Sequence, residues 1–279
     1  MSATAYALGA IALWATLATL GVQLAHVPPF LLTGLALAVG SLIALPWSRF
    51  DLRRWRVPAR TLALGVYGLF GFHALLFVAL RTAPPVQANL VNYLWPLLIV
   101  VLAPLLLPGV RLRPGHVVAA AVGFAGAAIA ILSAGTSGSP AFSLAWGYIP
   151  AIGSAFVWAS YSLLSKRVAP FPTAAIGAFC LLSAVLSLLC HALFEPAVAL
   201  GTRDWALIAV MGAGPLGAAF FLWDGALKRG DPRKLGVLSF VTPLASTVLL
   251  LLSRGQWPGP TVVLAGVMIV GAAVVAARA

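Results

Sequence analysis

The chain has 279 residues, of which 62% are hydrophobic and only 8% are charged, and its net charge at neutral pH is +12. A soluble domain of this size could not bury so much apolar surface, which excludes a soluble enzyme and a soluble nucleic-acid-binding protein. The composition predicts an all-α integral membrane protein that has lipid around most of its surface.

Apolar segments of about 20 residues follow one another along the chain, each long enough to cross the hydrocarbon core of a bilayer. We predict ten transmembrane helices, at 3–24, 29–47, 61–80, 85–106, 115–133, 143–165, 173–193, 204–227, 235–252 and 259–277. The connections are short, the longest being 49–60 and 134–142. They leave no room for a catalytic domain, so we expect that the protein is not an enzyme.

The basic residues fall mainly in alternate connections. If both termini lie on one side, that side has fourteen of the 17 basic residues, and the other has only Arg81, Arg203 and Arg254. The positive-inside rule then predicts that both termini lie in the cytoplasm. The positive charge is explained by topology and by contact with anionic lipid head groups, without nucleic acid.

The second half of the chain repeats features of the first. The matching positions include Trp14 with Trp158, Gly68 with Gly212, and Pro96 with Pro243, at offsets of 144 to 147 residues. The two units, 1–137 and 138–279, hold five predicted spans each. Because five is odd, the second unit must enter the bilayer from the opposite face. Such inverted repeats are typical of secondary transporters, whose substrate site lies near the midplane between the halves.

Equivalent spans of the two units have helix-weakening residues. The eighth span contains Gly212-Ala213-Gly214-Pro215-Leu216-Gly217, which spells GxGxxG but lacks the strand and the acidic residue of a dinucleotide site. Glycines and a proline instead predict an interrupted membrane helix. The candidate hinge residues are Gly68 and Gly71 in the third span, Pro96 in the fourth, Gly212, Gly214 and Pro215 in the eighth, and Pro243 in the ninth.

The nine tryptophans separate by predicted depth. Six lie near span ends, where indole rings favour the head-group region: Trp47, Trp55, Trp146, Trp205, Trp223 and Trp257. Trp14, Trp95 and Trp158 lie near the middle of spans and must place their N–H groups away from lipid. They are either packed between helices with an internal hydrogen bond or part of an aromatic wall around a central cavity.

Polar residues also occur at mid-span. His73 is the one ionisable side chain that we place near the bilayer centre, where such residues usually face a cavity. Asn89, Asn92 and Tyr93 share one face of the fourth span, and Ser239 and Thr242 occupy the matching part of the ninth. These side chains either line a substrate site or form hydrogen bonds between helices.

The five acidic residues, Asp51, Glu195, Asp204, Asp224 and Asp231, all lie in connections or near span ends, and Asp224 is spaced to pair with Lys228. Only His73 is left as a candidate proton carrier, so we predict facilitated transport without obligatory ion coupling. The four histidines lie in different spans, and Cys180 and Cys190 are too far apart for a disulfide. We therefore expect neither a metal nor a cofactor.

Together these features resemble the ten-helix EamA-type exporters of the drug/metabolite transporter superfamily. Within that branch, Gly71-Phe72-His73, Asn92-Tyr93-Leu94-Trp95-Pro96 and Phe156-Val157-Trp158 are similar to the exporters of aromatic amino acids. The resemblance implies a central aromatic cavity lined by His73, Tyr93, Trp95 and Trp158. Phe72 stands where that group leads us to expect a tyrosine, which removes one possible hydroxyl contact.

We therefore expect an exporter of tryptophan, phenylalanine and tyrosine in the bacterial inner membrane that works by alternating access, with related aromatic cations as side substrates. Two alternatives remain: an exporter of another small metabolite, such as a neutral amino acid or a nucleoside, and a passive channel or lipid scramblase. The expected partners are the substrate and the bilayer, and the expected state is a monomer or a weak oligomer.

Overall fold

The computed structural model describes residues 1–133 and 146–279, and within these ranges the regular secondary structure is entirely helical. Nine helical segments there are long and apolar enough to cross a membrane: Ala3–Gln23, Pro29–Trp47, Ala59–Thr82, Pro85–Leu106, Pro114–Ser133, Thr173–Phe194, Thr202–Arg229, Pro232–Ser253 and Pro260–Arg278. Each matches a predicted span to within a few residues. The sixth predicted span corresponds to a shorter apolar helix, α10 (Tyr148–Leu164), and its predicted start lies outside the described residues.

Several helices begin at a proline. Pro29, Pro85, Pro232 and Pro260 stand at the first position of α3 (Pro29–Leu42), α7 (Pro85–Asn92), α14 (Pro232–Leu238) and α16 (Pro260–Arg278). The fixed φ of proline suits this position, and its missing N–H would be unpaired there in any case.

The third and eighth spans are interrupted as predicted. In the third, α5 (Ala59–Val66) and α6 (Phe72–Thr82) are joined by a π-helical turn, η2 (Tyr67–Gly71). In the eighth, α12 (Thr202–Ala213) and α13 (Ala219–Arg229) are joined by another, η4 (Gly214–Ala218). Such turns disturb the regular hydrogen-bond ladder and frequently mark functional sites. The GxGxxG sequence is therefore part of a helix break.

The fourth and ninth spans are also broken. In the fourth, α7 ends at Asn92 and α8 (Trp95–Leu106) follows after Tyr93 and Leu94. In the ninth, α14 ends at Leu238 and α15 (Val241–Ser253) follows after Ser239 and Phe240. Pro96 and Pro243 lie in the first turns of α8 and α15, so each proline starts a new half-helix near the centre of its span.

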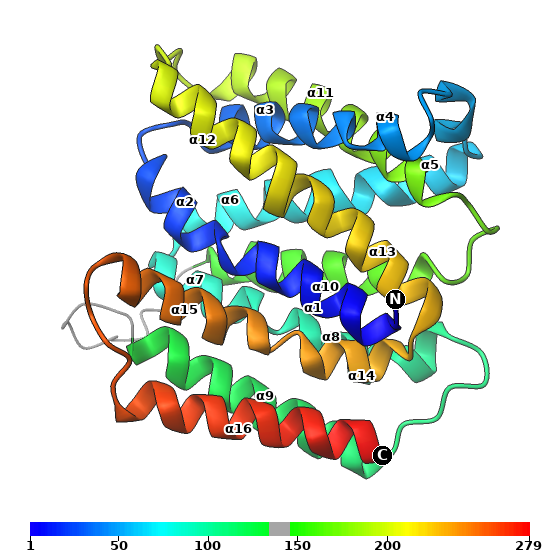
Figure 1. The fold of residues 1–279 in the computed structure, drawn as a ribbon, viewed down its shortest axis with the longest axis vertical. Helices are drawn as coiled ribbons and strands as arrows, with labels where there is room; N and C mark the ends of the chain where they lie inside the picture. The colour runs from blue at the N-terminus through cyan, green and yellow to red at the C-terminus, as the bar shows by residue number, and fades with distance from the viewer. Residues whose placement is uncertain (134–145) are drawn as a thin grey trace.

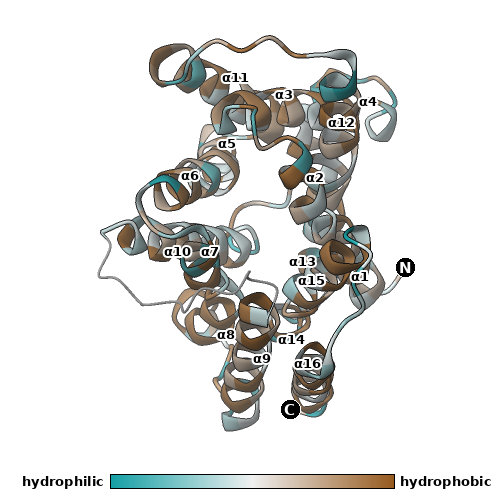
Figure 2. Ribbon diagram, turned by 90° about the vertical axis from the view of Figure 1, so that its left-hand side faces the viewer, coloured by the Kyte–Doolittle hydropathy of each residue, from teal (hydrophilic) through white to brown (hydrophobic). Residues whose placement is uncertain are grey.

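The helices lie side by side in roughly one direction, with both ends of the chain at the same side of the molecule (Figure 1). The pair α9 (Pro114–Ser133) and α16 forms one edge, and α3 with α11 (Ile176–Phe194) forms the other. Viewed along the helices, α2 (Leu17–Gln23) and α6 lie on one side of the centre, and α7 and α15 lie on the other (Figure 2).

Glycines allow α3 to approach the eighth span closely. A Cβ added at Gly40 would lie 2.5 Å from the carbonyl oxygen of Leu216, and one added at Gly212 would lie 2.5 Å from that of Ala36. Close backbone contact through small residues is the usual packing of helices in membranes, where there is no hydrophobic force to hold them together. This contact fixes α12 and η4 against the first half of the chain.

Large aliphatic side chains are exposed on the outer helices, among them Leu105 on α8, Leu193 on α11 and Val267 on α16. The hydropathy colouring shows the same apolar character along α9, α11 and α16 (Figure 2). In water such a surface would be unfavourable, whereas in a bilayer it faces lipid.

Trp223 does not lie at the membrane surface, where we predicted it. Its side chain is 1% exposed, packs 5.4 Å from Trp14 between ring centroids, and donates from Nε1 to Ser162 Oγ at 3.1 Å. The prediction was wrong because the helix continues to Arg229 and turns this residue toward the core. Trp47, Trp146, Trp205 and Trp257 are largely exposed, as expected.

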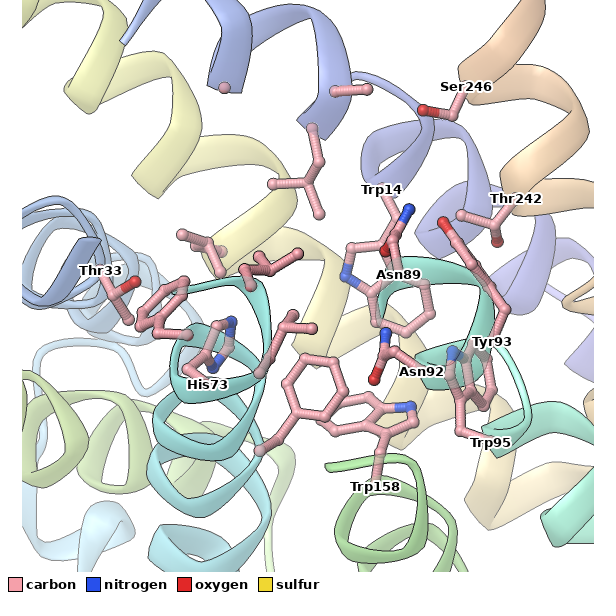
Figure 3. Close-up of a pocket in the computed structure, with 18 of the residues that line it drawn as sticks. Trp14, Thr33, His73, Asn89, Asn92, Tyr93, Trp95, Trp158, Thr242 and Ser246 are labelled. Carbon is pink, nitrogen blue, oxygen red and sulfur yellow. The ribbon is translucent and has the colours of Figure 1, made fainter. Parts of the chain in front are cut away.

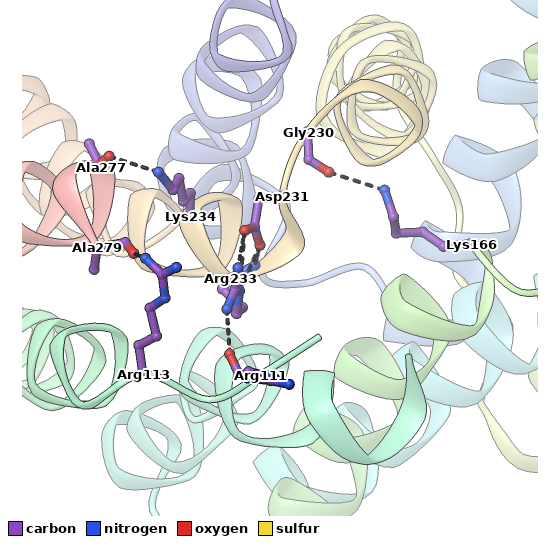
Figure 4. Close-up of polar contacts among 9 residues, drawn as sticks. All are labelled: Arg111, Arg113, Lys166, Gly230, Asp231, Arg233, Lys234, Ala277 and Ala279. Atoms are coloured by element: carbon purple, nitrogen blue, oxygen red, sulfur yellow. Dashed lines mark hydrogen bonds and ion pairs between the residues drawn. The ribbon is translucent and has the colours of Figure 1, made fainter. Parts of the chain in front are cut away.

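Lysine and arginine side chains form hydrogen bonds between segments at the end of the bundle where the chain termini lie (Figure 4). Lys166 donates to the carbonyl oxygens of Leu227 and Gly230, at the C-terminal end of α13, and Lys234 donates to that of Ala277 at 2.7 Å. Arg113 donates to the carbonyl oxygen of Ala279. Cations suit these positions because the carbonyls that end a helix have a partial negative charge.

Two acidic residues are more enclosed than predicted. Asp224 pairs with Lys228 at 2.6 Å, which confirms the predicted pair, but its side chain is buried and also accepts from Thr173 Oγ1 at 2.6 Å. Glu195 follows α11 and accepts from the backbone N–H groups of Phe30 and Leu31 at 3.0 and 3.1 Å and from Arg81 at 2.8 Å. Paired in this way, a carboxylate can be enclosed at a span end.

Candidate functional site

A cavity of about 370 Å³ lies at the centre of the molecule, within the range of small-molecule sites. Its wall comes from both halves of the chain and from the helix breaks. The lining residues are Trp14, Leu17, Ala18, Gly21, Leu32, Thr33, Phe72, His73, Leu76, Phe77, Leu80, Asn89, Asn92, Tyr93, Trp95, Trp158, Met211, Leu216, Phe220, Thr242 and Ser246. Apolar and aromatic side chains make up most of this surface, with polar groups at a few points (Figure 3).

The three mid-span tryptophans meet in this wall. The Trp14 ring centroid lies 5.7 Å from that of Trp158 and 6.3 Å from that of Trp95, with both pairs edge to face. Phe72 and Phe220 pack on Trp158 at 5.4 and 5.7 Å. These are favourable geometries for aromatic pairs, and the cluster presents both ring faces and ring edges to a ligand.

The indole N–H groups of the cluster differ in whether they have a hydrogen-bond acceptor in the protein. Trp14 Nε1 donates to the carbonyl oxygen of Pro215 in η4, at 3.1 Å. Trp14 thus has both of the roles considered for it, because it makes an internal hydrogen bond and lines the cavity. Within the described residues, Trp95 and Trp158 have no protein acceptor for their N–H groups.

His73 is held by the break in its own helix. Its Nδ1 lies 2.6 Å from the carbonyl oxygen of Leu69 in η2. A carbonyl oxygen only accepts, so Nδ1 is the protonated nitrogen of the neutral ring and Nε2 keeps its lone pair. The ring therefore offers an acceptor, and His73 lies toward the α6 side of the cavity in Figure 3.

Asn92 is fixed from the neighbouring helix. Ser154 of α10 donates from Oγ to Asn92 Oδ1 at 2.8 Å, and both side chains are buried. The amide nitrogen of Asn92 is left for another partner. Asn89, Tyr93, Thr242 and Ser246 provide further amide and hydroxyl groups on the same side of the cavity (Figure 3).

Nine of the ten residues that we predicted to bind substrate line this one cavity, namely Trp14, Phe72, His73, Asn89, Asn92, Tyr93, Trp95, Trp158 and Thr242. Ser239 does not line it: its hydroxyl donates to the carbonyl oxygen of Leu235 at 2.8 Å and the residue is fully buried. The predicted hinge residues lie in or beside the four helix breaks, with Gly68 and Gly71 in η2 and Gly214 and Pro215 in η4.

Several lining residues were missed by the sequence analysis. Phe77 and Ser246 lie one helical turn after His73 and Thr242 and share their helix faces, so i, i+4 spacing could have found them. Phe220 follows the break in the eighth span and could have been inferred from it. Thr33 had no comparable signal, because a single threonine in an apolar span is common.

No Asp, Glu, Lys or Arg belongs to the cavity lining of the described chain. No group of three or more His, Cys, Asp or Glu side chains that could hold a metal occurs in residues 1–133 and 146–279. The site therefore offers aromatic surface, neutral hydrogen-bonding groups and one histidine, which suits a small aromatic molecule bound without covalent chemistry.

Known proteins are similar to this chain in sequence and in fold. The model of the EamA-like transporter family matches residues 1–132 and 145–278. The chain is 42% identical over 280 residues to the aromatic amino acid exporter YddG of Ancylobacter novellus, which covers 99% of this chain and 96% of that protein. It is 24% identical over 193 residues to the uncharacterized transporter YyaM of Bacillus subtilis, covering 67% and 63%.

A crystal structure of a protein 42% identical in sequence superposes with a TM-score of 0.90, covering 99% of this chain and 97% of that one. Family membership accounts for the apolar surface, the helical bundle and the central cavity, and it places the protein among transporters and not among enzymes. The chain belongs to the EamA-like transporter family.

Proposed function

We propose that this protein exports aromatic amino acids across the bacterial inner membrane. The observation that carries the proposal is the central cavity, in which Trp14, Trp95, Trp158 and Phe72 form an aromatic wall beside neutral polar groups. Aromatic side chains of a substrate gain from offset and edge-to-face contact with such a wall. The 42% identity to an aromatic amino acid exporter over nearly the whole chain supports the same substrate class.

The proposed architecture is ten transmembrane helices arranged as two inverted five-helix repeats, 1–137 and 138–279. Support comes from the π-helical turns η2 and η4, which lie in equivalent spans, and from the family model, which matches the chain twice. An inverted repeat gives a transporter two related conformations, one open to each side.

Both termini are proposed to lie in the cytoplasm. The fourteen-to-three distribution of basic residues supports this orientation, as does the position of both chain ends at one side of the molecule. The hydrogen bonds of Arg113, Lys166 and Lys234 would then lie on the cytoplasmic side (Figure 4).

A substrate panel in proteoliposomes tests the function. Vesicles loaded with radiolabelled tryptophan, phenylalanine, tyrosine, alanine or a nucleoside are diluted, and saturable efflux is measured. We expect saturable efflux of the three aromatic amino acids. Preferred efflux of alanine or of the nucleoside would assign another metabolite. Non-saturating currents, or lipid flip without added substrate, would instead support the channel or scramblase alternative.

A further inference from the structure

We propose that Asn92, Trp95 and Trp158 form a subsite for the carboxylate of the substrate, and that Ser154 is the positioning residue for Asn92. The inference deepens the proposed function and rests on it, because an amino acid is the ligand that brings a carboxylate into an aromatic cavity. The three side chains lie in one region of the cavity (Figure 3).

The first support is the unequal use of four clustered indole N–H groups. Trp14 donates to Pro215 and Trp223 donates to Ser162. Trp95 and Trp158 line the cavity, are 5% and 3% exposed, and lack a protein acceptor among the described residues. An indole nitrogen can only donate, so a ligand group that pairs with these two N–H groups in the cavity must be an acceptor. Two such donors on rings 6.4 Å apart point to an anionic or carbonyl ligand.

The second support is the orientation of the Asn92 amide, which is 4% exposed. Ser154 has one hydroxyl proton, and both Asn92 Oδ1 and the carbonyl oxygen of Ala151 lie 2.8 Å from its oxygen. The Ala151 carbonyl lies inside α10 and has the regular helical N–H as a donor. The serine proton is therefore needed at Oδ1, which leaves the Asn92 NH₂ group to donate into the cavity.

The third support is the position of the subsite in the fold. Asn92 is the last residue of α7 and Trp95 is the first residue of α8, so the break between these two helices brings an amide donor and an indole donor to one part of the cavity wall. Since no Lys or Arg belongs to the described lining, an anion there must be held by such neutral groups. His73 Nε2, an acceptor, lies apart from these donors in Figure 3 and suits the ammonium group.

Binding of three indole ligands to the full-length purified protein tests the subsite. Tryptophan has both charged groups, indole-3-propionate has only the carboxylate, and tryptamine has only the ammonium. Asn92→Asp keeps the size of the side chain but replaces the donor by a negative charge. We expect this variant to bind tryptophan and indole-3-propionate about tenfold more weakly or worse, and to bind tryptamine as tightly as the wild type or more tightly.

Ser154→Ala should lower the affinity for the two carboxylate ligands several-fold and leave the affinity for tryptamine unchanged. Ser154→Thr keeps the hydroxyl and should therefore bind the carboxylate ligands as the wild type does. Trp158→Phe keeps an aromatic ring but removes the N–H, so it should affect the carboxylate ligands more than tryptamine. Ser183→Ala is the matched control, because Ser183 is a buried α11 serine whose hydroxyl has no partner in the described structure. We expect it to bind all three ligands as the wild type does.

The proposal of a carboxylate subsite is wrong if folded Asn92→Asp and Trp158→Phe proteins lose the same affinity for all three ligands, or lose affinity for none of them. The role of Ser154 is wrong if Ser154→Ala binds like the wild type. Wild-type protein that binds no tryptophan at all would instead overturn the proposed function.

Discussion

At the scale of single residues, the centre of this transporter depends on where a few tryptophans place their N–H groups. Trp14 and Trp223 are anchored to the protein, whereas Trp95 and Trp158 are available to a ligand. The anchored rings make the cluster rigid, and a rigid wall loses less entropy when a substrate binds.

Removal of an aromatic side chain from this wall should reduce transport of tryptophan and phenylalanine. We expect Trp158→Ala and Tyr93→Ala each to weaken apparent substrate affinity several-fold, since an aromatic contact contributes about 1 kcal/mol. Efflux from proteoliposomes at matched protein content measures the effect, and gel filtration checks folding. Wild-type efflux by both variants would exclude the aromatic wall as the binding surface.

The sequence predicted much of this site because side chains with hydrogen-bonding groups are unusual in the middle of a membrane span. Trp14, Trp158, His73 and Asn92 were visible for that reason. It could not predict the direction that each residue faces. Ser239 satisfies the same criterion as Thr242, yet it turns away from the cavity and bonds to its own helix, because the break after Leu238 rotates the chain.

At the scale of helices, four breaks surround the cavity, and two of them are followed by a half-helix that has a proline in its first turn. Their existence was predictable from Gly and Pro, which disturb the helical hydrogen-bond ladder. Their form was not predictable: the segments with glycine form π-helical turns in η2 and η4, and the segments before Pro96 and Pro243 form short turns.

Substitution of these prolines tests whether the breaks act as hinges. Pro96→Ala and Pro243→Ala each allow a continuous helix to form across a break. We expect substrate exchange to slow by more than the dissociation constant changes, because the breaks permit the motion and do not contact the whole ligand. Equilibrium binding and counterflow rates separate the two effects. A changed dissociation constant with unchanged turnover would mean that the prolines shape the site alone.

The contact between α3 and the eighth span should be sensitive to a single methyl group. Gly212→Ala would place a Cβ 2.5 Å from a backbone oxygen of Ala36, which cannot move aside easily. We expect a loss of about 1–3 kcal/mol in stability, seen as a lower unfolding temperature in detergent. Gly271→Ala is the control, since nothing lies within 4 Å of its added Cβ. Equal unfolding temperatures for both variants would contradict this packing.

At the scale of the whole molecule, the distribution of charge bears on the energy source. The described cavity has no carboxylate, and the enclosed acids Glu195 and Asp224 are paired near span ends. Carriers driven by protons or sodium commonly need an ionisable group inside the membrane. In the described part of the chain, His73 is the one histidine of the cavity lining, which has no Asp, Glu, Lys or Arg, and its Nδ1 is hydrogen-bonded to the carbonyl oxygen of Leu69.

We therefore expect facilitated transport down the substrate gradient. In proteoliposomes, an imposed pH gradient should not drive accumulation of tryptophan against its own gradient, although it can alter the rate. The measurement compares uptake at equal internal and external tryptophan with and without the pH gradient. Accumulation that depends on the pH gradient and disappears in His73→Asn would show that His73 couples transport to protons.

The hydrogen bond between Trp14 and Pro215 has a consequence for the empty carrier. It joins the wall of the cavity to the helix break η4 in the other half of the chain. Any motion that moves η4 away must break this hydrogen bond, and a Trp14 N–H group left without an acceptor costs about 1–3 kcal/mol. The carboxylate of a bound amino acid is a stronger acceptor than the neutral groups of the cavity wall and can replace the carbonyl oxygen. The loaded protein should then change conformation faster than the empty one, so substrate on the far side of the membrane should accelerate efflux.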